Sequence, residues 1–225
     1  MSLTVLDNIV WHTLTGAHRA HSAGTDTARR YATGFTPIVG FADNAHPDFA
    51  ALHDHCAPGE VFYCGGWSGP VPSGWDLHED TTMLQMVWDA PMPDAPQGLE
   101  AARLGPIDVA AMIELVALTN PGPFGKRTFE LGDYFGIFDG SRLVAMAGER
   151  MRAGGLREVS AVCTHPDYQG RGYARMLVTL LVRRQIQGGE RPFLHVMRAN
   201  HGARRIYARM GFREYQALPV RVVSR

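Results

Sequence analysis

Two glycines in a short loop are the first residues of this chain that suggest chemistry. Residues 169–174 follow a short apolar stretch and open a helical pattern, and they include Gly170 and Gly172. Because glycine has no Cβ, a ligand can approach the backbone closely at these positions. The first N–H groups of a helix have no intrahelical partners and therefore attract anions. The loop predicts an anion site, and a pyrophosphate is its natural occupant.

Two familiar phosphate-binding motifs do not match this loop. A P-loop needs a Gly-Lys-Ser/Thr sequence, which is absent from residues 169–174. A dinucleotide fingerprint needs a third glycine at the position of Arg175. A structural turn without a ligand stays open as the alternative to an anion site.

The elements around the loop are predicted from periodicity. Residues 156–163 form a short stretch that is nearly apolar after Glu158, as expected of a strand buried on both faces. From Tyr173 onward, apolar residues recur at helical spacing until the pair Gly188–Gly189 ends the pattern. Residues 192–197 then predict another strand. The glycine loop therefore connects a strand to a long helix.

A second motif follows that last strand, and it carries a resemblance. Asn200, Ala203, Tyr207 and the pair Gly211–Phe212 stand at fixed spacing after the loop and the intervening helix. With Gln169, Gly172 and Ala174 of the loop, this arrangement resembles the GNAT superfamily of acyl-CoA-dependent N-acyltransferases. The resemblance extends roughly from residue 99 to the C-terminus. The stretch 158–168, which ends in Thr-x-Pro-acid-Tyr, also resembles glycine N-acyltransferases.

The resemblance implies a fold and a cosubstrate. The fold is α/β (α+β), with a mixed, mostly antiparallel central sheet flanked by helices. Acetyl-CoA is the acyl donor, held by the loop amides and by a pantetheine channel where the strand ending at Thr164 splays from the strand beginning at Pro192. No metal is implied. The implied coenzyme contacts are Val162, Cys163, Thr164, Gln169, Gly170, Arg171, Gly172, Tyr173, Ala174, Asn200, Ala203 and Tyr207.

Acyl transfer from a thioester to an amine needs a base for the ammonium proton and benefits from an acid for the departing thiolate. In several members of the family a glutamate eleven positions before the first motif residue is the base, and Glu158 has this spacing to Gln169. Burial beside an apolar strand is expected to raise its pKa toward neutrality. Two alternatives stay open: Glu158 pairs structurally with Arg157 or Arg150, or Glu149 on the neighbouring strand is the base.

Tyr207 is the candidate acid, because a phenol is protonated at neutral pH and can donate to the coenzyme sulfur. The alternative is a buried aromatic anchor on the helix. Asn200 either binds the pantetheine arm or caps that helix. Cys163 lies in mid-strand, and the direct transfer needs no thiol nucleophile.

The first 95 residues are expected to form an appended α/β region, with the possibility of a degenerate GNAT-like half. We expect helices over 7–21 and from Pro47, a short strand within 31–41, and strands over 60–64 and 81–88. The sequence His53-x-His55-Cys56 lacks the paired spacing of a zinc site and is interpreted as a polar helix end.

Prolines in residues 91–98 predict a linker, and the acyltransferase domain is assigned to residues 96–225. Within it we expect an opening strand at 100–104, a helix capped by Asp108, and a hairpin whose turn is 139–142. Lys126 and Arg127 follow the loop 120–125, on the expected acceptor side, where they could meet a carboxylate of the acceptor.

Composition excludes some partners. The 225 residues carry 22 basic and 22 acidic side chains, a balance that gives no reason to expect nucleic acid or membrane as a partner. No apolar run is long enough for a membrane helix, and the first residues do not form a signal peptide. Three cysteines without paired spacing favour a cytoplasmic protein.

Two hypotheses follow. The favoured one is an acetyl-CoA-dependent N-acetyltransferase that acts on a small-molecule amine or amino acid in preference to a protein, with a homodimer as a possible assembly. The alternative is a sensor or interaction protein that binds acyl-CoA on the same fold with weak catalysis.

Overall fold

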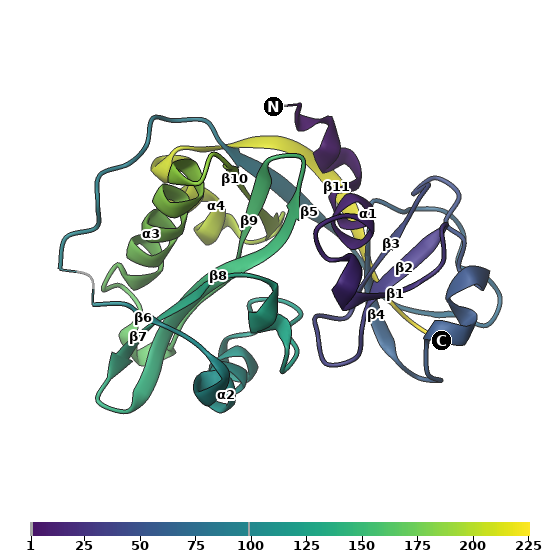
Figure 1. Cartoon of the computed structure of the whole chain (residues 1–225), viewed down its shortest axis with the longest axis horizontal. Coiled ribbons are helices and arrows are strands. Elements are labelled where there is room, and N and C mark those ends of the chain that lie inside the picture. Colours follow the sequence, from purple (N-terminus) through teal and green to yellow (C-terminus); the bar gives the residue numbers. More distant parts are fainter. Residues whose placement is uncertain (1, 99) are drawn as a thin grey trace.

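The computed structural model describes residues 2–98 and 100–225, and the two remaining residues, Met1 and Leu99, lie outside the described residues. In the described chain, eleven strands form one curved sheet in the order β1-β2-β3-β4-β11-β5-β10-β9-β8-β7-β6. Figure 1 shows β1–β4 gathered at one end, beside the C-terminal half of β11, while α2, α3 and α4 lie toward the other end. Most strand pairs are antiparallel, and the exceptions are β3 with β4 and β9 with β10. The mixed, mostly antiparallel sheet flanked by helices is thus confirmed.

The first region contains short helices and strands. Its elements are η1 (Leu3–Asn8), α1 (Ile9–Thr15), η2 (Arg19–His21), β1 (Ser22–Gly24), β2 (Ala28–Tyr31), β3 (Ile38–Phe41), η3 (Ala50–His55), β4 (Val61–Gly65) and β5 (Asp76–Trp88). The predicted long helix over 7–21 is wrong, because α1 ends at Thr15 and the residue at its N-cap position is Asn8, not Asp7. Instead, the Asp7 carboxylate accepts a hydrogen bond from the Tyr215 hydroxyl.

The second region follows the predicted order of elements. They are β6 (Ala102–Arg103), η4 (Pro106–Asp108), α2 (Val109–Thr119), η5 (Thr128–Leu131), β7 (Tyr134–Asp139), β8 (Arg142–Ala153), β9 (Leu156–Thr164), η6 (Pro166–Tyr168), α3 (Tyr173–Gln187), β10 (Arg191–Met197), α4 (His201–Met210) and β11 (Phe212–Ser224). Asp108 precedes α2 as expected, but its carboxylate accepts from the N–H of Gly105 and makes no cap bond to α2.

Strand β5 links the two regions. It comes from the first 95 residues, yet it lies between β10 and β11 and pairs antiparallel with both. The proline-rich segment after it runs outside α3 in Figure 1, where Arg183 of that helix donates to the carbonyl of Pro93. The division at residue 95 stays a prediction, and in the sheet the strands from its two sides are interleaved.

The sheet carries different cores on its two faces. On one face, apolar residues of α3 such as Leu177 and Leu181 pack against Val159 and Leu194. On the other, residues of α1 and η1 pack against Val87, Leu156 and Phe193. Successive side chains of one strand point to opposite faces of the sheet. Adjacent residues of β10 therefore serve the α3 core and the α1 core.

Strands β9 and β10 separate partway along their length. Their parallel pairing runs from Leu156 with Arg191 to Val159 with Leu194 and then stops. The predicted splay is therefore present. Just beyond this point Ala161 has a φ of 51°, a left-handed conformation unusual for alanine, and the register against β8 shifts between Met146 and Gly148. This is a β-bulge, and it bends β9 away from β10 next to the gap.

Candidate active site

The splay opens into a cavity of about 490 Å³ that reaches from α4 to the strands of the first region. Glu158 lines this cavity, and so do seven of the predicted coenzyme contacts. These seven contacts are Val162, Cys163, Thr164, Gln169, Asn200, Ala203 and Tyr207. The structure therefore brings Gln169 of the first motif to the same cavity as Asn200, Ala203 and Tyr207 of the second.

Apart from Gln169, the glycine loop lies outside the lining of this cavity, and it leads into the N-terminus of α3. Gly170 and Gly172 have φ values of 78° and 83°, and a Cβ built on either would meet no atom within 4 Å. No hydrogen bond in the described chain uses the backbone N–H of residues 170–175. Open space and unbonded N–H groups at a helix N-terminus fit a pyrophosphate. The remaining predicted contacts, Arg171, Tyr173 and Ala174, belong to this loop and the first turn of α3.

Between the loop and the bulge, one buried hydroxyl also fits a bound group. Thr164 Oγ1 is buried and has no hydrogen-bond partner among the described residues. Such groups are uncommon because leaving them unpaired is costly. Asn200 caps α4, since its Oδ1 accepts from the N–H of Ala203 at 3.0 Å. The alternative in which Asn200 caps the helix is confirmed. Asn200 also lines the cavity.

Tyr207 projects from α4 beside Cys163 and packs edge-on against Phe212, with the two ring centroids 6.0 Å apart. Burial, followed by the proximity of Cys163, raises the pKa of Tyr207 to about 12. The phenol is therefore protonated at neutral pH. Its hydroxyl has no hydrogen bond within the described chain, so it is free to donate to a ligand.

Glu158 is buried and saturated with hydrogen bonds. Arg150 donates to both carboxylate oxygens, from Nε at 3.0 Å and from Nη2 at 2.8 Å. The N–H of Met151 donates to Oε2 at 3.1 Å, and Nδ1 of His195 lies 2.7 Å from Oε1. The alternative in which Glu158 pairs with Arg150 is thus part of the structure, and both residues line the cavity.

This environment reverses the expected change in acidity. Burial by itself raises the pKa of Glu158, but the charge of Arg150 and the hydrogen bond from His195 outweigh it, and the pKa lies well below its ordinary value. The expectation of a pKa raised toward neutrality is therefore wrong. That expectation rested on desolvation, which the buried guanidinium of Arg150 on the adjacent strand outweighs.

His195 and Gln85 were not identified from the sequence. Gln85 Nε2 lies 3.0 Å from the carbonyl of Leu6, which can only accept, so this nitrogen is a donor. The same nitrogen lies 3.1 Å from Nε2 of His195, which must therefore accept. Nδ1 of His195 is then the donor in its contact with Glu158. The available signal was a single polar residue inside each of two apolar strand patterns.

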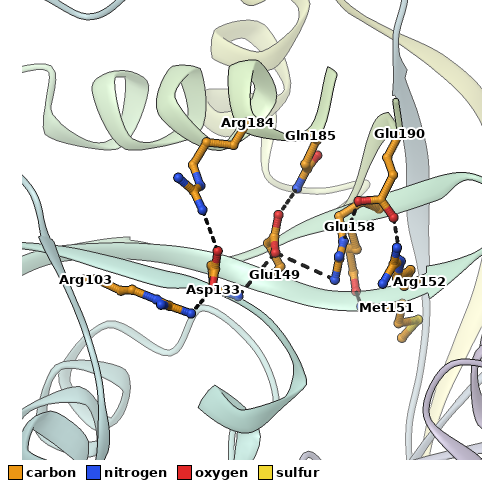
Figure 2. A network of polar contacts seen from close by, with 10 residues as sticks. Arg103, Asp133, Glu149, Met151, Arg152, Glu158, Arg184, Gln185 and Glu190 are labelled. Atoms are coloured by element: carbon orange, nitrogen blue, oxygen red, sulfur yellow. Dashed lines mark hydrogen bonds and ion pairs between the residues drawn. The ribbon is translucent and has the colours of Figure 1, made fainter. Parts of the chain in front are cut away.

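Glu149, the other candidate base, belongs to a different network. Its carboxylate accepts from Gln185 of α3 at 3.0 Å and from the N–H of Asp133 at 3.2 Å. Figure 2 shows this side chain reaching toward Gln185, beside the ion pair of Asp133 with Arg184. Glu149 does not line the cavity that holds Glu158 and Tyr207.

Cys163 is also unsuited to nucleophilic attack. Burial raises the pKa of its thiol to about 11. Because the thiolate is the nucleophilic form, the protonated thiol is unreactive at neutral pH.

The part of the cavity away from α4 is built jointly by both regions. Pro121 and Pro123 of the loop after α2 line it, and the Thr36 hydroxyl donates to the carbonyl of Pro123 at 3.0 Å. Lys126 and Arg127 do not line it. The Arg127 guanidinium instead bonds Glu130.

Comparison with known proteins agrees with this architecture. Residues 134–220 match the model of the FR47-like protein family. A protein assigned to the GNAT family of acetyltransferases, from Novosphingobium aromaticivorans DSM 12444, is 33% identical over 98% of both chains, with a TM-score of 0.89. A GCN5-related N-acetyltransferase from Kribbella flavida is 18% identical over 100% of this chain and 96% of its own, with a TM-score of 0.66. Among curated proteins, none matches significantly.

The fold and the site define an acetyltransferase of the GNAT type. Given its likeness to the Novosphingobium protein over nearly the whole of both chains, this chain belongs to the GNAT family of acetyltransferases. Within residues 2–98 and 100–225, no helix is long and apolar enough to cross a membrane. The same residues contain no cluster of His, Cys, Asp and Glu side chains arranged to hold a metal ion.

Proposed function

We propose that this protein transfers an acetyl group from acetyl-CoA to a primary amine by direct attack in a ternary complex. The observation that carries the proposal is the shared cavity, which is lined by Tyr207, by the α4 cap Asn200 and by Glu158. Acetyl-CoA supplies the activated acyl group when it is bound. The acceptor is a small-molecule amine, because the acceptor end lies within a cavity walled by the first region.

The loop and the splay would hold the coenzyme. The unbonded N–H groups of residues 170–175 suit the pyrophosphate, and the unpaired Thr164 hydroxyl suits a polar group of the pantetheine arm. Ala161 and Val162 have no partners in the β8–β9 register. A backbone N–H freed at this bulge can polarise the thioester carbonyl.

Proton transfer is assigned to two side chains. Tyr207 donates its phenolic proton to the departing sulfur, for which its raised pKa and unbonded hydroxyl are suited. Glu158 remains the proposed acceptor of the ammonium proton, directly or through water. Its low pKa keeps it anionic and makes it a weak base, so its charge also holds the amine in place as positive charge develops on the nitrogen.

Cys163 takes no covalent part in this scheme. Likeness to glycine N-acyltransferases stays a prediction, and the two cations after the acceptor loop do not support a carboxylate-bearing acceptor because they lie outside the cavity. An acyl-CoA sensor on the same fold is the competing function.

A screen of amines with acetyl-CoA separates the two functions. We expect free thiol to appear only when an amine is present, together with a product whose mass is increased by one acetyl group. Coenzyme binding without amine-dependent thiol release for any amine would favour the sensor.

A further inference from the structure

The acceptor end of the cavity is the end away from α4, and its floor is a patch on one face of the sheet. The strand register shows which residues form this patch. Ile38 pairs with Tyr63, Tyr63 with Val222, and Val222 with Glu79, so these four residues form one row across four strands. In the next row on the same face, Gly65 pairs with Val220 and Val220 with Thr81. Side chains two residues apart on a strand share a face. All of these residues line the cavity.

This patch has an apolar floor and a carboxylate at its rim. Ile38, Val220 and Val222 are buried, Tyr63 is half-buried, and Glu79 is exposed. Within the described chain Glu79 makes neither an ion pair nor a hydrogen bond with another side chain. Its charge nevertheless reaches Tyr63, because after burial it is the second cause that raises the pKa of that phenol.

The other two charged residues in the cavity lining, Arg150 and Glu158, neutralise each other. Arg150 and Glu158 form a buried bidentate pair, and His195 donates to the same carboxylate. No unpaired Lys or Arg is found among the lining residues of the described chain. The acceptor end therefore presents one uncompensated negative charge, and a carboxylate on the acceptor would find no cation there.

The position of Glu79 on β5 sets the distance between the acceptor end of the cavity and the β9–β10 splay. Glu79, Thr81 and Met83 alternate along β5 on the face of the cavity, and Met83 pairs with Met197 near the β9–β10 splay. At about 3.3 Å per residue, Glu79 is roughly 13 Å along the strand from Met83. A long acceptor could therefore have one end at the splay and the other at Glu79.

We propose that the acceptor is an elongated amine with an apolar chain and a second cationic group, which Glu79 binds while the first amine receives the acetyl group. This assignment rests on the proposed acetyltransferase function and adds the substrate class. Glu79 is a specificity-determining residue in this scheme and takes no part in the proton transfers.

Three acceptors of equal chain length test the assignment: octylamine, 1,8-diaminooctane and 8-aminooctanoic acid. For the native protein we expect kcat/KM for the diamine to exceed that for octylamine by about fivefold, the gain expected of an exposed ion pair. The amino acid should be the poorest substrate. Glu79→Gln should remove the preference for the diamine mainly through KM, and Glu79→Lys should shift the preference to the amino acid.

Asp80→Asn is the matched control. Asp80 is the adjacent carboxylate on β5 but points to the opposite face, where it accepts from Arg221. The Asp80→Asn variant should keep the native preference for the diamine over octylamine. Equal rates for the diamine and octylamine in the native protein, or the same preference in Glu79→Gln as in Asp80→Asn, would overturn the assignment.

A thermal-shift measurement with coenzyme A distinguishes a wrong substrate class from a wrong proposed function. If coenzyme A stabilises the protein but none of the three amines is acetylated, the substrate class is wrong and coenzyme binding stands. If coenzyme A causes no shift, the proposed function itself fails.

Discussion

Glu158 has one role in the stability of the fold and a second, proposed role in acyl transfer. As one half of a buried bidentate ion pair it stabilises the fold, and as a carboxylate that lines the cavity it is the proposed partner of the amine. Resemblance to family members with a glutamate at the same spacing before Gln169 was enough to single out Glu158, and the structure has it in the cavity lining. Its low pKa could not be predicted, because that depends on Arg150 and His195, which come from other strands.

Glu158→Gln should therefore lower both activity and stability. Removing one partner of a buried ion pair costs about 3–5 kcal/mol in the free energy of unfolding, which urea denaturation at pH 7 measures. The folded pKa of Glu158 lies below its ordinary value of 4.5, so its stabilisation is complete above pH 4.5 and is lost as the pH falls toward the folded pKa. The stability difference between native protein and variant should therefore narrow below pH 4.5.

A double variant separates the two roles. Arg150→Gln with Glu158→Gln removes both charges, so it should recover part of the lost stability but none of the lost kcat/KM at pH 7. Raising the pH should partly restore the rate, since more of the acceptor amine is then neutral. Full activity in the folded double variant would show that the carboxylate serves the fold alone.

Tyr207 offers a cleaner separation, because its hydroxyl has no hydrogen bond in the described chain. Tyr207→Phe keeps the packing against Phe212 and should leave the melting temperature nearly unchanged. If the phenol protonates the leaving thiolate, kcat should fall by roughly 10²-fold, within the range for acid–base groups.

Tyr215→Phe is the control for Tyr207→Phe, since that hydroxyl bonds Asp7 on the surface and should not affect kcat. An unchanged kcat in Tyr207→Phe, with the chemical step shown to be rate-limiting, would leave Tyr207 as a packing residue.

At the scale of elements, the strand, glycine loop and α3 were the most predictable part of the chain. Apolar spacing, a proline break and glycines at both helix ends all point to the same structure, and Gly172 and Gly189 at those ends do have a positive φ. The short helices of the first region were less predictable. Their boundaries depend on local turns, and α1 is held by packing of Ile9, Val10 and Leu14 on the sheet, which periodicity does not show.

The loop prediction is tested by adding a charge at the helix N-terminus. Coenzyme A at about a hundred times its dissociation constant should stabilise the native protein by about 2.7 kcal/mol. Gly172→Asp should abolish this stabilisation, because the added carboxylate repels the pyrophosphate. Titration calorimetry and thermal shift both measure the effect.

Gly189→Asp is a closely matched control at the other end of α3. Gly189 has a φ of 75°, and a Cβ there also meets no atom within 4 Å, so the backbone strain is similar. This variant should keep its coenzyme response. Equal loss of the response in both variants would mean that strain, and not charge at an anion site, explains the result.

At the scale of the whole molecule, the position of β5 was the main feature that the sequence did not reveal. Residues 81–88 were expected as a strand, but nothing local indicated that β5 extends back to Asp76 or enters the sheet between β10 and β11. Strand order is decided by long-range pairing, for which one sequence contains little information. The same pairing brings the first region to the acceptor end of the cavity.

This interleaving predicts cooperative unfolding. Because β5 and β11 are paired over nearly their whole lengths, the first region cannot detach without breaking the centre of the sheet. Scanning calorimetry should give one transition whose calorimetric and van't Hoff enthalpies agree. Two separate transitions would support independent domains divided near residue 95.

Direct transfer in a ternary complex is the central claim, and initial-rate kinetics test it most directly. Thiol release is measured while acetyl-CoA and 1,8-diaminooctane, or the best amine from the screen, are varied together. We predict intersecting double-reciprocal lines, because both substrates must be bound before acetyl leaves the sulfur, and Cys163→Ala should keep this pattern. Parallel lines, with acetyl trapped on the protein when the amine is omitted, would indicate a covalent intermediate and contradict the account.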